Sequence, residues 1–244
     1  MQLTLILIFK QYSTTVRFMF DGRCSFHHQT DLQELPNCLI VELSNCRIMN
    51  ICVFCSSSNA ISEIYFDEAK KLGKLIGDNH HEIIYGGATV GLMHTVAEAA
   101  RQAGARSVGI IPESIHSKRL SSPFDHEQII TPNMRERKYL MRKRSDAFIA
   151  LPGGFGTLEE ILEVITLKQL QYHNKAIVFV NTDGFYDSLF GQFERAYRDS
   201  FSKVDYKSTY FIAADAEEAI AYIQNYQPVE QTSKWFDVPG PSRL

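Results

Sequence analysis

The stretch Asp146-Ala-Phe-Ile-Ala-Leu-Pro-Gly-Gly-Phe-Gly-Thr-Leu-Glu-Glu160 decides the fold of this chain. Residues 147–151 form an apolar run of strand length, and beyond the glycines apolar residues recur at the spacing of a helix. The sequence therefore predicts a strand that passes through a glycine-rich turn into a helix over residues 157–171. A strand–turn–helix unit of this kind is the repeating element of α/β sheets.

The same turn predicts a site for an anion. Glycine has no side chain to keep a ligand away, so Gly153, Gly154 and Gly156 allow a close approach to the backbone. The free N–H groups and the dipole at the start of the following helix favour negative charge there. Six basic residues lie just upstream: Arg135, Arg137, Lys138, Arg142, Lys143 and Arg144. A phosphate-bearing ligand is the simplest partner for both features.

Two common glycine-rich nucleotide sites do not fit these residues. The dinucleotide fingerprint requires G-x-G-x-x-G, whereas the run that starts at Gly154 places Glu159 at the third glycine position. Residues 86–91 have the glycine spacing of a Walker A loop, but Leu92 and Met93 stand where that loop has its lysine and hydroxyl residue. The sequence therefore supports neither NAD binding nor ATP hydrolysis.

Outward from this unit, strand-like and helix-like segments alternate along the chain from residue 49 onward. Strands are predicted at residues 51–54, 82–85, 107–111, 147–151 and 176–180, with weaker ones at 128–130 and 210–212. Helices are predicted at residues 64–77, 91–103, 133–145, 157–171, 185–199 and 216–225. This alternation predicts an α/β fold, a Rossmann-like doubly wound parallel sheet with helices on both faces. Ligands bind such sheets beyond the carboxyl ends of the strands, where the glycine turn is expected.

The two ends of the chain do not share this pattern. Residues 1–48 contain a short apolar run at 3–9, with no basic residue ahead of it as a signal peptide requires. Met49, by contrast, directly precedes the first predicted strand. We expect residues 1–48 to be an extension without function or a misassigned start, residues 49–227 to form the functional domain, and residues 228–244 to be an irregular tail.

Composition and charge narrow the class of protein. A net charge of −3 in 244 residues argues against a nucleic-acid binder, and no apolar run reaches the length of a transmembrane helix. Five cysteines, an odd number, are typical of a reducing compartment, so we expect a cytoplasmic protein. Cys52 and Cys55 form a CxxC pair, but strand residues three apart face opposite sides, so we expect neither a metal site nor a redox pair there.

Two motifs in this region resemble those of a known enzyme family. Pro152-Gly-Gly-Phe-Gly-Thr-Leu-Glu-Glu160 matches P-G-G-x-G-T-x-x-E, and Met134-Arg-Glu-Arg-Lys138 matches M-x-x-R-K, the paired signatures of the Lonely Guy (LOG) family. That family comprises cytokinin riboside 5′-monophosphate phosphoribohydrolases, long mislabelled as lysine decarboxylases. The resemblance covers about residues 49–225. It implies hydrolysis of the N-glycosidic bond of a nucleoside 5′-monophosphate, without a metal or organic cofactor, to a free adenine-type base and ribose 5-phosphate.

The resemblance also implies roles for individual residues. The catalytic pair of the family maps by motif onto Arg137 and Glu160. Its substrate contacts map onto Glu113, Arg137, Lys138, Gly154, Phe155, Gly156, Thr157, Leu158, Glu159, Glu160 and Thr166. This chemistry needs a phosphate anchor and a carboxylate that stabilises an oxocarbenium-like sugar and orients the attacking water. The glycine turn suits the phosphate, and Thr157 adds a hydroxyl donor or caps the helix.

Other interpretations of these residues stand beside this one. Glu159 and Glu160 could simply complement the dipole at a helix start, and basic residues of a helix usually form a solvated face. A nucleotide- or molybdenum-cofactor-binding carrier on the same scaffold is the alternative function, although a carrier does not need both Arg137 and Glu160. Within the hydrolase interpretation, the base is either N6-prenylated adenine or plain adenine, so an activity like that of AMP nucleosidase is included.

The glycine-turn helix also predicts an assembly. Four apolar residues share the face expected to pack on the sheet: Leu158, Ile161, Leu162 and Ile165. Glu160 falls on the other side, where Val164 and Leu167 flank it. A second apolar strip beside a functional carboxylate predicts a partner surface. We expect a homodimer with active sites at or near the interface, as the family resemblance also implies.

Overall fold

The computed structural model describes residues 4–9, 12–17 and 48–229 of the chain, which divides into two units, residues 1–44 and 45–244. In the first unit, strand β1 (Thr4–Phe9) pairs antiparallel with β2 (Tyr12–Arg17). The sequence does not predict these strands, because neither run alternates apolar and polar residues as a two-sided strand does. Most of the predicted tail, residues 230–244, lies outside the described residues.

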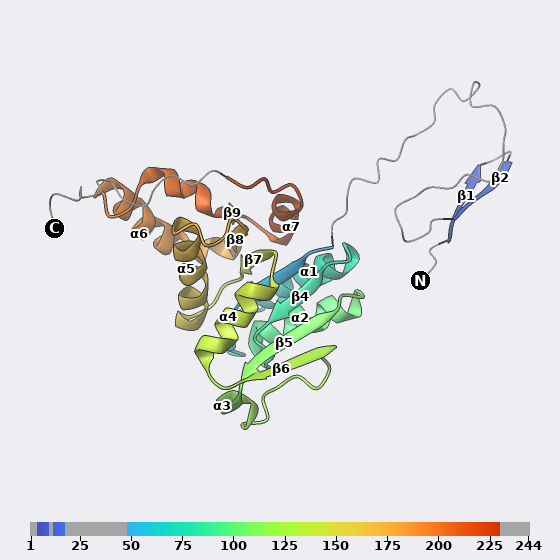
Figure 1. Ribbon diagram of the computed structural model, residues 1–244, viewed down its shortest axis with the longest axis horizontal. Coiled ribbons are helices and arrows are strands. Elements are labelled where there is room, and N and C mark those ends of the chain that lie inside the picture. Colours follow the sequence, from blue (N-terminus) through green and yellow to red (C-terminus); the bar gives the residue numbers. More distant parts are fainter. Residues whose placement is uncertain (1–3, 10–11, 18–47, 230–244) are drawn as a thin grey trace, which may run out of the picture. The chain divides into compact units, whose positions relative to one another are not determined.

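A seven-stranded parallel sheet forms the centre of the second unit (Figure 1). Its strands are β3 (Asn50–Phe54), β4 (Glu82–Tyr85), β5 (Ser107–Pro112), β6 (Glu127–Thr131), β7 (Ala147–Ala150), β8 (Ala176–Val180) and β9 (Phe211–Ala213). Their order is β6-β5-β4-β3-β7-β8-β9, so the chain runs from β3 to one edge and then from β7 to the other. This order confirms the doubly wound fold, and it places the switch point of the sheet, where ligands bind in such folds, between β3 and β7.

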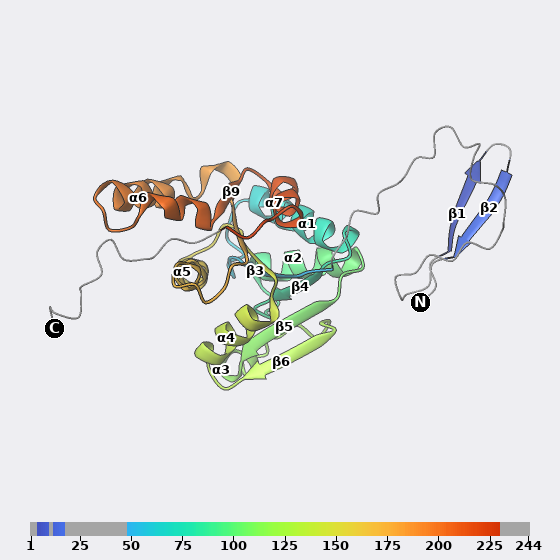
Figure 2. The same cartoon turned by 45° about the horizontal axis from the view of Figure 1, so that its top comes forward.

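Helices cover both faces of the sheet, as predicted (Figures 1 and 2). One face carries α1 (Glu63–Asp78), α2 (Gly91–Gln102) and α7 (Ala216–Gln224). The other carries α4 (Met134–Arg144), α5 (Phe155–Gln169) and α6 (Asp187–Arg198). Three short turns were not predicted: α3 (Glu113–His116), η1 (Thr182–Gly184) and η2 (Val204–Thr209). Across the described residues, no helix combines the length and the apolar character that crossing a bilayer requires.

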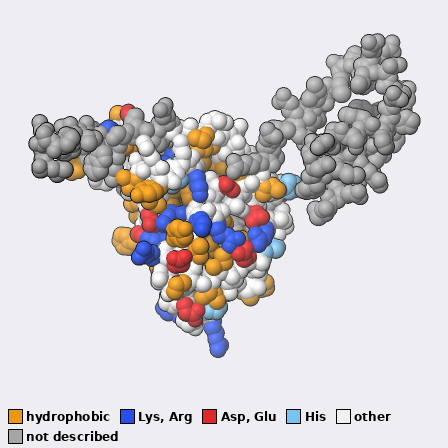
Figure 3. Space-filling model, in the orientation of Figure 1, with side chains coloured by type: hydrophobic (Ala, Val, Ile, Leu, Met, Phe, Trp, Pro, Cys, Tyr) orange, Lys and Arg blue, Asp and Glu red, His pale blue; other side chains and the backbone are white. Residues whose placement is uncertain are grey.

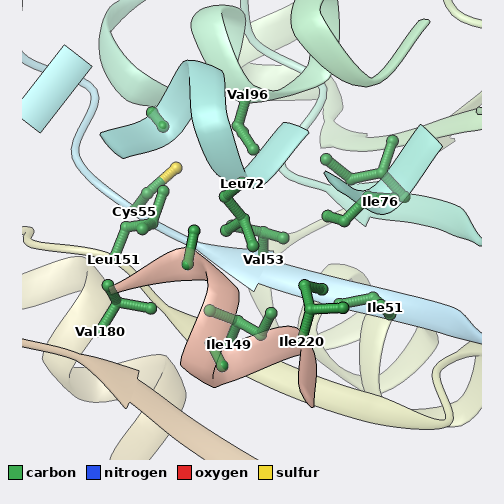
Figure 4. Packing of buried hydrophobic residues seen from close by; sticks show 14 of the residues in the cluster. Ile51, Val53, Cys55, Leu72, Ile76, Val96, Ile149, Leu151, Val180 and Ile220 are labelled. Carbon is green, nitrogen blue, oxygen red and sulfur yellow. The ribbon is translucent and has the colours of Figure 1, made fainter. Parts of the chain in front are cut away.

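Alternation along the strands separates the core into two clusters. Cys55 lies in the cluster with α1, α2 and α7, whereas Cys52 lies in the cluster with α4 and α5, so the two thiols face opposite sides as predicted. Both are free and buried, and burial raises the pKa of each thiol. Figure 4 shows the first cluster, to which Val53 of β3, Leu72 of α1 and Ile220 of α7 belong.

The buried face of α5 differs from the predicted one. Its buried residues are Thr157, Glu160, Ile161, Val164, Ile165 and Lys168. Leu158 and Leu162, predicted to face the sheet, are only half-buried at the edge of the cluster. Val164 is fully buried, so Val164 and Leu167 do not form the exposed second apolar strip that the sequence predicted. Ile161 and Ile165 are buried as predicted, but the rest of the prediction was wrong because it assigned only apolar residues to the core side, while polar residues occupy three of its positions.

Candidate active site

The glycine turn lies at the switch point of the sheet. The backbone N–H of Leu151 donates to the carbonyl of Phe54 at 3.0 Å, and that of Ser56 donates to the carbonyl of Pro152 at 3.2 Å. These bonds join the chain segments that leave β3 and β7, at the carboxyl ends of both strands. The turn and the first residues of α5 therefore occupy the position where α/β sheets of this type bind ligands.

The glycines of this turn have different roles. A Cβ added at Gly153 would lie 2.2 Å from Oγ1 of Thr157, so the chain itself requires a glycine there. At Gly154 and Gly156 a Cβ would meet none of the described atoms within 4 Å, and the intervening Phe155 is 92% exposed. The start of α5 therefore faces open space, into which its N–H groups can donate to an anion.

Helix α5 begins two residues earlier than predicted. Its N-cap is Gly154, so Thr157 is a buried residue within the first turn and not the cap. Glu159 and Glu160 consequently lie in the second turn. The interpretation of Glu160 as a carboxylate that merely complements the helix start is therefore weakened, because the dipole acts mainly on the first turn.

Arg137 of α4 and Glu160 of α5 form a buried ion pair. Nη1 of Arg137 donates to Oε1 of Glu160 at 2.8 Å, and both side chains are 9% exposed. Nε of the same arginine donates to the carbonyl of Ile110, in β5, at 3.1 Å. Burial raises the pKa of the Glu160 carboxyl, and the charge of Arg137 opposes this rise. The two residues that the sequence predicts to be catalytic are thus brought together near the switch point, although 23 positions separate them.

The backbone of Gly86 supports the guanidinium of Arg137. A Cβ added at Gly86 would lie 2.3 Å from Nη2 of Arg137 and 2.8 Å from Sδ of Met93. Nη1 of Arg137 is 3.8 Å from Sδ of Met134. The sequence offered Gly86 only as part of a glycine spacing that does not fit a Walker A loop, whereas the contact with Arg137 shows why a glycine is needed there.

Gly86→Ala is expected to lower kcat by about 10²-fold, because the added methyl displaces the guanidinium of Arg137 and small misplacements have effects of this size. The backbone of Gly86 is not in the left-handed region, so the alanine adds no backbone strain. Gly191→Ala is the matched control, since a Cβ there meets none of the described atoms within 4 Å. Equal kcat values for the two variants would contradict the inference that Gly86 positions the guanidinium of Arg137.

Lys138 and Glu159, two predicted substrate contacts, bind each other. Nζ of Lys138 also lies 3.4 Å from Glu163, which pairs with Arg142 at 2.6 Å. Burial lowers the pKa of Lys138, but the hydrogen bond to Glu159 and the charge of Glu163 outweigh it and raise that pKa. These pairs join α4 to α5 beside a hollow of about 390 Å³, and Figure 3 shows acidic and basic side chains side by side on this face.

Two further predicted contacts lie apart from the ion pair. Glu113 is exposed at the start of α3, directly after β5 and therefore on the same rim of the sheet. Thr166 is exposed on α5, and its hydroxyl donates to the carbonyl of Leu162 at 2.8 Å. Thr166 lies six residues beyond Glu160, which corresponds to about 9 Å along a helix. It points away from the buried face, so one chain alone does not bring Thr166 to the ion pair.

The fold and the site define a Rossmann-like protein with a glycine turn at the switch point of its sheet and a buried Arg–Glu pair. A family model described as "Possible lysine decarboxylase" matches residues 93–223. The chain is 37% identical to the cytokinin riboside 5′-monophosphate phosphoribohydrolase LOG5 of Arabidopsis thaliana, over 80% of this chain and 87% of that protein. It is also 37% identical to LOG3 of the same plant, over 76% of this chain and 86% of the relative. The chain belongs to the LOG family.

Solved structures show the same fold. The molybdenum cofactor binding protein of Rippkaea orientalis superimposes with a TM-score of 0.58 and 24% identity, over 73% of this chain and 96% of that one. The Moco carrier protein of Chlamydomonas reinhardtii gives a TM-score of 0.55 and 22% identity, with the same coverage. At these identities the likeness concerns the fold alone, whereas the LOG relatives are similar in sequence as well.

Proposed function

We propose that this protein hydrolyses the N-glycosidic bond of cytokinin riboside 5′-monophosphates, the activity for which its LOG relatives are named. The observation that carries the proposal is the buried pair of Arg137 and Glu160, which lies next to the open N-terminus of α5. A carrier of a nucleotide or cofactor has no use for a buried carboxylate with a raised pKa. A glycosyl hydrolase requires a carboxylate at the anomeric carbon.

The start of α5 is the proposed phosphate anchor. Gly154 and Gly156 leave space in front of the helix, and the N–H groups of its first turn are available to the phosphate oxygens. Glu160 lies in the second turn of α5, on the buried side of the helix. A nucleotide anchored by its 5′-phosphate at the turn would direct its ribose toward this carboxylate.

Glu160 is the proposed catalytic carboxylate and Arg137 its partner. In the reaction the bond between the anomeric carbon and the base nitrogen breaks, and the base leaves with the bonding electrons and takes up a proton. Glu160 stabilises the positive charge that develops on the sugar and orients the water whose oxygen then bonds to the anomeric carbon. Arg137 keeps the carboxylate ionised in its buried position and holds its orientation.

We further infer that the protein acts as a homodimer. Thr166 faces away from the ion pair of its own chain, so a role in substrate binding requires that it contact the substrate of a second copy. Phe155 is exposed next to Leu158 and Leu162, which are half-buried, and an apolar surface of this kind suits an interface. Sedimentation at micromolar concentration is expected to give a dimer, and a monomer would contradict the inference.

The proposal is tested by product analysis with two substrates. Purified protein is incubated with isopentenyladenosine 5′-monophosphate and, separately, with AMP. We expect free base and ribose 5-phosphate from the first, and the ratio of the two rates measures the preference for a prenylated base, including any activity like that of AMP nucleosidase. Binding of either nucleotide without cleavage would refute the hydrolase and favour the carrier.

A further inference from the structure

A buried ionisable cluster joins β4 to α2, on the face of the sheet opposite to α4 and α5. At its centre the side chain of Asp125 is 0% exposed. The hydroxyl of Tyr85 lies 2.8 and 3.0 Å from the two carboxylate oxygens and donates its proton to them. Nη1 of Arg101 donates to Oδ1 at 3.1 Å. Burial raises the pKa of both Asp125 and Tyr85, and none of these groups takes part in the proposed chemistry.

Asp125 is connected to Arg137 by two separate routes. Tyr85, which bonds Asp125, is followed by Gly86, whose backbone supports Nη2 of Arg137. On the neighbouring strand, a Cβ added at Gly109 would lie 2.2 Å from Oδ2 of Asp125. Gly109 is followed by Ile110, whose carbonyl accepts the Nε–H of Arg137. Both backbone segments that hold the guanidinium therefore adjoin residues that contact the same carboxylate.

The segment that carries Asp125 also binds the loop after β4. The N–H of Ser122 donates to the carbonyl of Gly87 at 2.9 Å, and the N–H of Thr89 donates to the carbonyl of Leu120 at 2.8 Å. Ala88 and Ser121 form an antiparallel bridge between these bonds. The segment thus holds the glycine loop from both sides, through its backbone at residues 120–122 and through the Asp125 side chain below.

We propose that Asp125 and Tyr85 are positioning residues, which hold Gly86 and Ile110 so that Arg137 keeps the orientation in which it pairs with Glu160. An arginine side chain has many rotamers, and confining it to one has an entropic cost that fixed neighbours reduce. The geometry of a catalytic pair is sensitive, since a shift of about 1 Å changes rates by about 10²-fold. Neither residue touches the substrate in this scheme.

The test compares two tyrosine variants. Tyr85→Phe removes only the hydroxyl that bonds Asp125, while Tyr226→Phe is the matched control. The Tyr226 hydroxyl bonds another buried ionisable group, Lys168, at 2.8 Å near the far end of α5. The readout is the pKa of the Glu160 carboxyl, followed by carbon-13 NMR titration of labelled protein.

The expected direction follows from the groups that face Glu160. These are Arg137 and Lys138 on α4, Glu159 on its own helix, and the thiols of Cys52 and Cys55 on β3 and the loop after it. Arg137 lowers the pKa of Glu160, so an arginine held less well lowers it less. In Tyr85→Phe we expect the Glu160 pKa to rise by about one unit, kcat to fall about tenfold and KM to stay within about twofold.

The control defines what would overturn the inference. Tyr226→Phe is expected to lower thermal stability to a similar degree but to leave the Glu160 pKa and kcat unchanged. The inference is refuted, and the cluster is structural only, if Tyr85→Phe also leaves the Glu160 pKa and kcat unchanged. The same conclusion follows if Asp125→Asn leaves the Glu160 pKa and kcat at their wild-type values. The kinetic arm rests on the proposed function, whereas the titration needs no substrate. A wild-type protein that cleaves neither nucleotide would therefore refute the function, while the titration still decides the inference.

Discussion

Glu160→Gln is expected to lower kcat by about 10³-fold while the protein stays folded. The amide has nearly the shape of the carboxylate, and its oxygen can still accept the Nη1–H of Arg137. What it lacks is the negative charge that stabilises the developing oxocarbenium ion and orients the water. The measurement is release of base and ribose 5-phosphate under single-turnover conditions, with circular dichroism to confirm folding.

Glu163→Gln is the control for this variant. Glu163 lies on the same helix, one turn further, and pairs with Arg142 and Lys138 in the partly exposed contact between α4 and α5 instead of with Arg137. We expect its kcat to stay within about threefold of the wild type, the size of effect typical of exposed ion pairs. If both glutamine variants retain activity, Glu160 is not the catalytic carboxylate.

The raised pKa of Glu160 determines the acid limb of the pH profile. In the proposed mechanism the ionised carboxylate is the active form, and burial raises the pKa at which it takes up a proton. Activity is therefore lost, as the pH falls, at a higher pH than the ordinary glutamate value of about 4.3 would give. The profile of kcat/KM reports this group in the free enzyme. An acid limb at or below pH 4.3 would contradict the assignment.

Arg137→Lys is expected to lower kcat by about 10²-fold and to lower the melting temperature as well. A lysine keeps the positive charge, but its single ammonium group cannot bond both the Ile110 carbonyl and Glu160 in the geometry of the arginine fork. Complete removal of the charge would leave Glu160 buried and unpaired, at a cost of about 3–5 kcal/mol. The lysine variant therefore shows an effect on activity with less unfolding than a variant with an uncharged residue at position 137.

Arg142→Lys provides the comparison for this second variant. Arg142 also lies on α4 and pairs with a glutamate of α5, but its partner Glu163 is partly exposed. We expect its activity and melting temperature to be close to those of the wild type, because surface pairs contribute little to stability. Similar losses in both lysine variants would mean that the contact between α4 and α5, and not the buried pair, governs activity.

The sheet was predictable from the sequence because its central strands are buried on both faces. Strands β4 and β8 begin and end at the predicted residues, since a short apolar run between polar segments has few alternatives. The residues proposed as the catalytic pair could be singled out only from the family motifs. Nothing local to Arg137 indicates that it reaches Ile110, 27 positions earlier, and Glu160, 23 positions later.

The parts that the sequence did not predict depend on polar residues in buried positions. On α5 the hydrophobic spacing of Leu158 and Leu162 suggested the core face, while Glu160 and Lys168 in fact occupy it. The spacing of apolar residues alone does not identify buried positions that polar residues occupy. Asp125 was missed for a related reason, because it meets Tyr85 only through a contact that spans 40 positions.

The burial of Glu160, the proposed catalytic carboxylate, on the core side of α5 has a consequence for heating. Glu160 lies one helical turn from Val164 and next to Ile161, both fully buried in the cluster that packs α5 on the sheet. Regions that open locally below the melting temperature have few buried contacts, whereas Glu160 packs among fully buried residues. Loss of activity and loss of structure should therefore share one midpoint, so that no temperature range exists in which the enzyme is folded but inactive.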